Sequence, residues 1–83
     1  MEFRVSNHAK EEMVRRSISE QHLITVMNTP PQQIVSTRGD LKAYQSIVDF
    51  GNGKMFLIRV IVNDNVEPAV VVTVYITSKI AKY

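Results

Sequence analysis

The sequence of 83 residues contains no cysteine. Disulfide bonds and zinc sites with thiolate ligands are therefore excluded. The longest apolar stretches have the length of a strand and fall well short of the about 20 residues that a membrane-spanning helix needs. Nothing at the N-terminus resembles a signal peptide, because the first residues mix acidic and basic side chains. We therefore expect a cytoplasmic protein with no membrane partner.

A large excess of one charge is also missing, because the formal net charge is only +2. Such a weak imbalance permits an anionic partner but does not predict one. No basic stripe runs along any predicted element, so a nucleic-acid interface must be argued from the positions of individual residues. His8 and His22 do not have the spacing of metal ligands and no third ligand accompanies them, which disfavours a metal-dependent enzyme. We expect neither a metal nor another cofactor.

The length of the chain, with 45% apolar residues, suits one small domain that has one core. No internal repeat, low-complexity segment or linker divides the sequence. Residues 1–83 are therefore predicted to form a single domain.

A first helix of roughly three turns is predicted within Ser6–Ile18. Ser6 or Asn7 supplies an N-cap, acidic residues follow early and arginines come near the end, as the helix dipole favours. The helical spacing places Ala9 and Met13 together on one face.

A second helix begins at Ser17 or Ser19 and runs to about Asn28. Either serine is a suitable N-cap, and Pro30 and Pro31 follow the expected end, where proline removes a backbone donor. An apolar stripe at helical spacing gives this helix one buried face. The stripe consists of Leu23, Val26 and Met27.

From Gln33 onward the pattern has the period of strands. Four strands are predicted, at Gln33–Thr37, Lys42–Phe50, Met55–Val62 and Ala69–Thr77. Arg38–Asp40 is read as a turn, and Gly51–Gly53 closes a tight hairpin. Phe3 and Val5 alternate with charged residues, which leaves a short edge strand open at Met1–Val5. The predicted fold is α+β, with two helices on one face of a four-stranded antiparallel meander.

Burial of the apolar strand faces fixes the expected register, because a slip of one residue would turn them outward. Val62 is expected opposite Val70. This pairing places Arg59 opposite Thr73 and Leu57 opposite Tyr75, and it turns Tyr44 toward the helices.

The first hairpin adds a third strand to this register. Closing it with Phe50 opposite Lys54 places Gln45 opposite Arg59. We therefore predict a polar row of Gln45, Arg59 and Thr73, with Tyr75 close by, on the face away from the helices. A buried guanidinium needs water, a carboxylate or a ligand, and its donor fork suits phosphate. The alternative is an arginine that only covers apolar neighbours with its methylene groups.

The sequence resembles a widespread family of small prokaryotic domains known only as domain-of-unknown-function family 4258. The resemblance lies in His8-Ala9, Met13, Arg16 and Ile18, where the family typically reads His-Ala-x-x-Arg-Met-x-x-Arg-Gly-Ile. It continues in the C-terminal half, with a Tyr-bearing strand, a strand like Leu57–Val60 and a strand like Val72–Tyr75. Glu12 replaces the usual arginine and Ser17 replaces the usual glycine.

That family in turn resembles the RelE-like and BrnT-like toxins. The resemblance implies a RelE-like or barnase-like toxin architecture and a metal-independent ribonuclease of a toxin–antitoxin system. RNA, including mRNA, would be the substrate, and a small antitoxin protein would be a partner. In this interpretation His8, Arg59, Thr73 and Tyr75 are catalytic, whereas Arg16 and Gln45 bind RNA phosphate.

The roles follow from the chemistry of cleavage by the ribose 2′-OH. The reaction needs a base, an acid and positive charge at the phosphoryl oxygens. His8 is the candidate acid or base, Arg59 with Arg16 the phosphate clamp, and Tyr75 a stacking or proton-donating group.

A second interpretation is a non-catalytic protein-interaction module that uses the same sheet face. Glu12 and the low net charge favour it. The valine-rich strand Ala69–Thr77 could be an exposed edge, at which a second copy or an antitoxin strand would add to the sheet.

Overall fold

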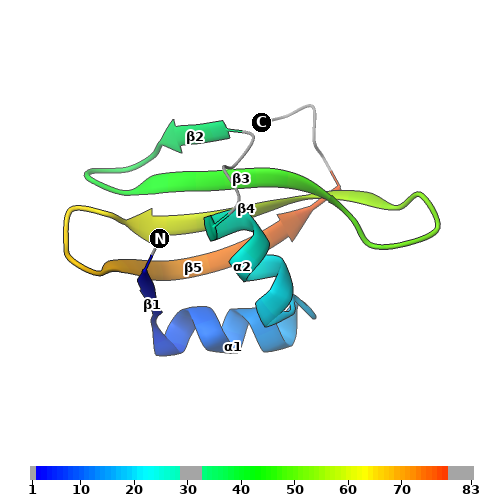
Figure 1. Ribbon diagram of the computed structural model, residues 1–83, viewed down its shortest axis with the longest axis horizontal. Coiled ribbons are helices and arrows are strands. Elements are labelled where there is room, and N and C mark those ends of the chain that lie inside the picture. The colour runs from blue at the N-terminus through cyan, green and yellow to red at the C-terminus, as the bar shows by residue number, and fades with distance from the viewer. Residues whose placement is uncertain (1, 29–32, 79–83) are drawn as a thin grey trace.

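The structure is a computed structural model that describes residues 2–28 and 33–78. Figure 1 shows two helices beside a long twisted sheet. The elements are β1 (Phe3–Val5), α1 (Asn7–Arg15), α2 (Glu20–Asn28), β2 (Gln33–Ser36), β3 (Lys42–Asp49), β4 (Met55–Asn63) and β5 (Ala69–Thr77). Both helices and the four strands from Gln33 onward lie where the sequence predicts them, with small shifts at some ends. Pro30, Pro31 and Met1 lie outside the described residues.

The sheet corrects the predicted meander of four antiparallel strands. It has five strands in the order β1-β5-β4-β3-β2, and β1 pairs in parallel with Ala69–Val71 of β5. The fold is therefore α+β with a mixed sheet. A strand of three residues gives almost no alternation signal, and its partner lies at the other end of the chain. One consequence is that β5 is not an edge strand, since the edges are β1 and β2.

Ser6 both starts α1 and ties it to the sheet. Its side-chain oxygen accepts a hydrogen bond from the backbone N of Ala9 at 3.1 Å, which is the N-cap predicted for this residue. The same hydroxyl donates to the carbonyl of Val72 at 3.0 Å, and the backbone N of Ser6 donates to the carbonyl of Val71. The first turn of α1 is therefore held against the middle of β5.

The end of α1 has the two hydrogen bonds of a Schellman motif. The N–H of Ile18 donates to the carbonyl of Met13 at 2.9 Å, and the N–H of Ser17 donates to that of Val14 at 3.3 Å. Ser17 has φ of 56°, in the left-handed region where glycine is favoured. Ile18 and Met13, the positions at which this motif typically has a hydrophobic pair, are both buried in the same core cluster.

The core lies between the helices and one face of the sheet. α1 packs on β5, and α2 packs on β3 and β4 (Figure 1). Ala9 and Met13 of α1 are buried, as predicted. Tyr44 is also buried in this core, which confirms the direction predicted for it. From the sheet the core further contains Ile58, Val60, Val62, Val71 and Val74.

A bulge between β4 and β5 changes the predicted register. Ile61 pairs with Thr73 but Val62 pairs with Val71, so that Val72 is an extra residue on β5. The prediction that Val62 lies opposite Val70 was therefore wrong. Val71 and Val74 are both fully buried, although residues three apart on a regular strand point to opposite faces. The extra residue of the bulge lets both side chains point into the core.

Candidate nucleic-acid interface

Four polar side chains form one row across four strands on the face away from the helices. The register aligns Gln33 of β2 with Gln45 of β3, Gln45 with Arg59 of β4, and Arg59 with Tyr75 of β5. The predicted pairing of Gln45 with Arg59 is confirmed. Thr73 was predicted opposite Arg59, which is wrong, because the bulge moves Tyr75 into that place and leaves Thr73 opposite Ile61.

Hydrogen bonds connect the members of this row, which we call the Arg59 row. Nε2 of Gln45 donates to Oε1 of Gln33 at 2.9 Å, and Nε of Arg59 donates to Oε1 of Gln45 at 2.8 Å. Nη1 of Arg59 donates to the hydroxyl of Tyr75, and the centre of the guanidinium lies 5.3 Å from the centroid of the tyrosine ring. Both ends of the Gln45 amide are used, so the row orients the guanidinium from two sides.

Gln45 is the anchor of the row, because its residue is only 2% exposed. A buried amide is costly unless it is hydrogen-bonded, and here Gln33 and Arg59 satisfy it. Leu57 flanks Arg59 on the same face of β4 and is buried, and Arg59 itself is half-buried. A guanidinium with apolar neighbours interacts with an anion more strongly than one in bulk water.

Gln33 completes the row and was not predicted as a site residue. A signal for it exists in the sequence, because the turn at Arg38–Asp40 joins β2 to β3. Pairing Ser36 with Lys42 across this turn and continuing the antiparallel register places Gln33 opposite Gln45. Continuing the antiparallel register from one strand to the next, which predicts the pair of Gln45 and Arg59, therefore also predicts the pair of Gln33 and Gln45.

His8 and Arg16 lie on α1 and not in the Arg59 row. His8 is exposed, and no side-chain interaction of His8 is present in the part of the chain that the structure describes. α1 lies along the β5 side of the sheet (Figure 1), which is the placement that His8 would need to approach the outer face. The start of α1 is held at Val72 of β5, however, because Ser6 donates a hydrogen bond to the Val72 carbonyl. Val72 and Tyr75 are three residues apart along the strand, which is a distance of roughly 10 Å.

Glu12 engages both arginines at the end of α1. Its carboxylate contacts Nη2 of Arg15 at 2.7 Å and Nη2 of Arg16 at 3.5 Å. Burial by itself raises the pKa of the Glu12 carboxyl, but the hydrogen bonds and charges of the two arginines outweigh it and leave the pKa below its ordinary value. The positive charge of Arg16 is therefore shared with a carboxylate of its own helix.

A second polar cluster, which the sequence analysis missed, lies at the start of β3. Oδ2 of Asp64 accepts hydrogen bonds from Nζ of Lys42 at 3.1 Å and from the hydroxyl of Tyr44 at 2.9 Å. Burial and the neighbouring Asp64 carboxylate raise the pKa of Tyr44. Burial by itself raises the pKa of Asp64 too, but the hydrogen bonds from Tyr44 and Lys42 bring it below its ordinary value. The hairpin register, which pairs Lys42 with Val62, indicates this neighbourhood.

His22 has no metal-binding role in the sequence interpretation, and in the structure it packs against an aromatic ring. Its ring is half-buried and lies 4.5 Å from the ring of Phe50, and its Nδ1 is 2.9 Å from Oγ of Ser19. Ser19 also accepts a hydrogen bond from the backbone N of His22 at 3.1 Å, so it serves as the N-cap of α2. His22 therefore packs α2 onto the β3–β4 hairpin.

Within residues 2–28 and 33–78, no three His, Asp or Glu side chains gather as a metal site would require. No helix in the same part of the chain is long and apolar enough to cross a membrane.

The fold and the Arg59 row define a small α+β domain that presents a hydrogen-bonded polar row on the outer face of its sheet. A family model described as "Domain of unknown function (DUF4258)" matches residues 5–76, and the chain belongs to this family. No curated protein matches the sequence. No solved structure matches it either.

Proposed function

We propose that the chain is a toxin-like, metal-independent ribonuclease that binds RNA on the outer face of its sheet. The Arg59 row carries this proposal. A planar guanidinium that is oriented by Gln45 and Tyr75 offers its donors in a fixed geometry, which suits the oxygens of a phosphodiester. The resemblance that the sequence suggests to RelE-like and BrnT-like toxins is in line with this proposal. Those toxins are small ribonucleases with helices and a four-stranded sheet, to which this chain adds the parallel strand β1.

In the proposed reaction the ribose 2′-oxygen attacks the adjacent phosphorus and loses its proton to a base. The bond from phosphorus to the 5′-oxygen breaks, and that oxygen takes a proton from an acid, which leaves a 2′,3′-cyclic phosphate. Arg59 stabilises the charge on the phosphoryl oxygens, and Tyr75, whose hydroxyl accepts from Arg59, can donate its own proton. Thr73 lies two residues before Tyr75 and therefore on the same face of β5. His8 remains the proposed second acid–base group, and Arg16 a further phosphate contact.

The experiment is induced expression in a bacterial host, with growth and the integrity of total RNA as readouts. We expect wild type to arrest growth and cleave RNA, and Arg59→Ala and Tyr75→Phe to do neither. Arg38→Ala is the matched control, because it removes one positive charge from an exposed turn outside the row. Thermal unfolding of each purified variant separates loss of the site from loss of the fold.

A second candidate function, a non-catalytic protein-interaction module, is favoured by one observation. Glu12 pairs with Arg15 and Arg16, so the basic end of α1 is partly neutralised at the position where relatives typically have another arginine. Normal growth and intact RNA with wild-type protein that is folded and abundant would reject the active ribonuclease. The interaction module would then be the function to pursue, first with co-purification of a bound protein.

A further inference from the structure

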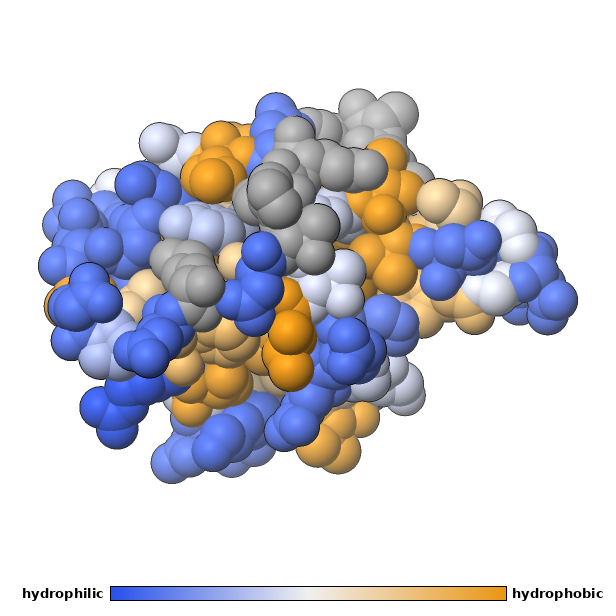
Figure 2. All heavy atoms as spheres, in the orientation of Figure 1, coloured by the Kyte–Doolittle hydropathy of each residue, from blue (hydrophilic) through white to orange (hydrophobic). Residues whose placement is uncertain are grey.

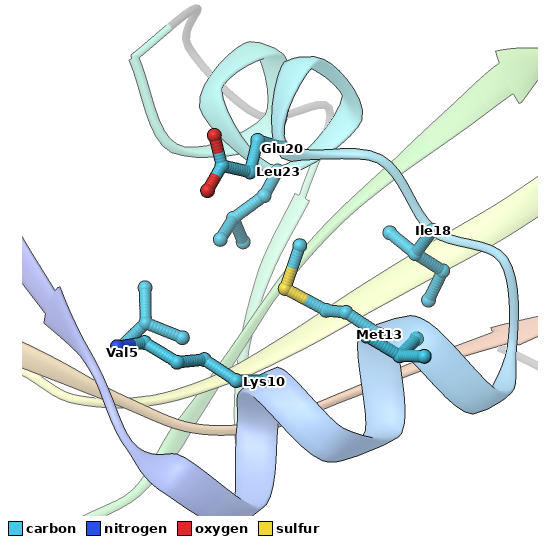
Figure 3. Close-up of a pocket in the computed structure, with 7 residues that line it drawn as sticks. Val5, Lys10, Met13, Ile18, Glu20 and Leu23 are labelled. Atoms are coloured by element: carbon cyan, nitrogen blue, oxygen red, sulfur yellow. The ribbon is translucent and has the colours of Figure 1, made fainter.

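A second feature, unrelated to the Arg59 row, lies on the opposite side of the molecule. A cavity of about 290 Å³ opens where α1, α2 and β1 meet. Figure 2 shows apolar surface gathered in the angle between the two helices, with hydrophilic surface on either side. The cavity is lined by Val5, Lys10, Met13, Val14, Ile18, Glu20 and Leu23. In Figure 3, Met13 from α1 and Leu23 from α2 point toward one another across it.

The lining of this cavity suits apolar side chains of another protein. At about 290 Å³ the cavity is at the small end of the range of about 300–1,000 Å³ that ligand pockets usually hold. Met13, Ile18 and Leu23 form an almost fully buried floor. Val14 stands at the rim and is 82% exposed, the most exposed large apolar side chain in the described residues. An apolar hollow with an exposed apolar side chain beside it, and charged residues around it, matches the apolar core and polar rim of protein interfaces.

The charges at the rim are of opposite sign and come from different helices. Lys10 extends from α1 toward Val5, and Glu20 projects from the start of α2 (Figure 3). In the described part of the chain, neither side chain takes part in an ion pair or a side-chain hydrogen bond. The rim therefore offers a cation and an anion to whatever covers the hollow.

We propose that this surface binds a second copy of the same chain, to form a two-fold symmetric dimer through α1 and α2. In such a dimer the same patch faces itself, so each feature must find its complement on the same surface. The patch meets this condition twice. Val14 of one copy would enter the hollow of the other, and Lys10 of one copy would face Glu20 of the other.

The first test measures molar mass in solution by light scattering at protein concentrations up to about 1 mM, the weak end of specific association. We expect twice the mass of the chain for wild type, and the mass of one chain for Val14→Asp. Ile34→Asp is the matched control, because Ile34 is 52% exposed and apolar but lies on β2, at the far edge of the sheet. It should remain a dimer. Loss of the dimer in Ile34→Asp alone would move the interface to the sheet edge and overturn the proposal.

A charge-exchange series then tests the symmetric pairing. Lys10→Glu alone and Glu20→Lys alone each place like charges together and should weaken dimerisation by about ten-fold, whereas the double variant should recover most of the affinity. All three variants keep the apolar floor, but Glu20→Lys places a cation in the first turn of α2, so thermal unfolding of each variant separates a weaker dimer from a weaker fold. Monomeric wild type at every concentration, or a double variant no better than the single ones, would reject the self-complementary dimer. A folded monomer that pairs with another protein through Val14 would point to a heterologous partner instead.

Discussion

Ser17 illustrates how a single residue can conflict with the backbone that it occupies. Its φ of 56° completes the Schellman motif after α1, and a left-handed backbone costs a non-glycine residue about 1–2 kcal/mol. Glycine would avoid this cost but lose more entropy on folding, about 0.4–1 kcal/mol. We therefore expect Ser17→Gly to raise the free energy of unfolding by about 0.5–1 kcal/mol. Urea denaturation measures the change.

The control for this prediction is Ser17→Ala, which removes the same hydroxyl but keeps the Cβ atom. It should give no stabilisation, because the strain comes from the backbone conformation and not from the side-chain oxygen. Equal stabilisation by alanine and glycine would show that the left-handed conformation is not the cause.

The Asp64 cluster predicts a dependence of stability on acid. The hydrogen bonds from Tyr44 and Lys42 keep the pKa of Asp64 below its ordinary value, so the folded state favours the ionised carboxylate. The stabilisation is then complete above about pH 4, the ordinary pKa, and is lost as the pH falls through the lower folded-state pKa. Asp64→Asn should therefore be less stable than wild type near neutral pH, with a difference that shrinks below about pH 4.

Chemical denaturation at a series of pH values measures this difference. Glu11→Gln, which removes an exposed acid from α1, is the matched control and should follow the wild-type curve. A difference between wild type and Asp64→Asn that stays constant from pH 7 to about pH 2 would contradict the linkage.

At the scale of elements, Ser6 connects a helix to the sheet through one side chain. Its hydroxyl caps α1 through Ala9 and donates to Val72 of β5. A lost N-cap costs about 0.5–2 kcal/mol, and a lost hydrogen bond about 0.5–1.5 kcal/mol. We expect Ser6→Ala to lower the free energy of unfolding by about 1–2 kcal/mol. Asn7→Ala, at the exposed first residue of α1, should change it far less, and similar losses in both variants would argue against the bridging role.

The pairing of the strands shows which parts of the fold could be predicted from the sequence. The β3–β4 register could be, because Gly51–Gly53 closes a short hairpin that leaves little freedom, and Gln45 does pair with Arg59. The β4–β5 register could not, because Val70, Val71 and Val72 are chemically equivalent and nothing marks which one is the extra residue. The predicted partner of Arg59 therefore changed from Thr73 to Tyr75.

The candidate site also has a part that the sequence predicts and a part that it does not. The pair of Gln45 and Arg59 was predicted correctly, because a tight turn joins their strands and fixes the register. The placement of His8 relative to Arg59 depends on how α1 packs, and this is set by β1 and by Ser6, whose contacts reach across 66 positions of sequence. Long-range contacts of this kind leave no periodic signal in the sequence.

For the molecule as a whole, the two proposed surfaces lie on opposite faces of the sheet. Gln45 and Arg59 alternate with core residues such as Tyr44 and Ile58 along their strands, so their side chains point away from the helices. Val14 lies on α1, on the helical side. None of the described residues that line the cavity belongs to the Arg59 row. His8 and Arg16, which the proposed ribonuclease also uses, lie on α1 or at its end with Val14, but six and two positions from it, spacings that do not share a helical face. The two surfaces are therefore separable by mutation.

This separation gives a reciprocal prediction for two variants, each assayed for both properties. Arg59→Ala should abolish growth arrest and RNA cleavage but keep the dimer mass, whereas Val14→Asp should become monomeric but keep RNA cleavage. The reason is that each substitution removes contacts on one face and leaves the hydrogen bonds or packing of the other intact. Light scattering and total-RNA analysis of the same preparations provide the two readouts. If Val14→Asp lost both properties while remaining folded, the active form would be the dimer, and the two faces would have to act together across the interface.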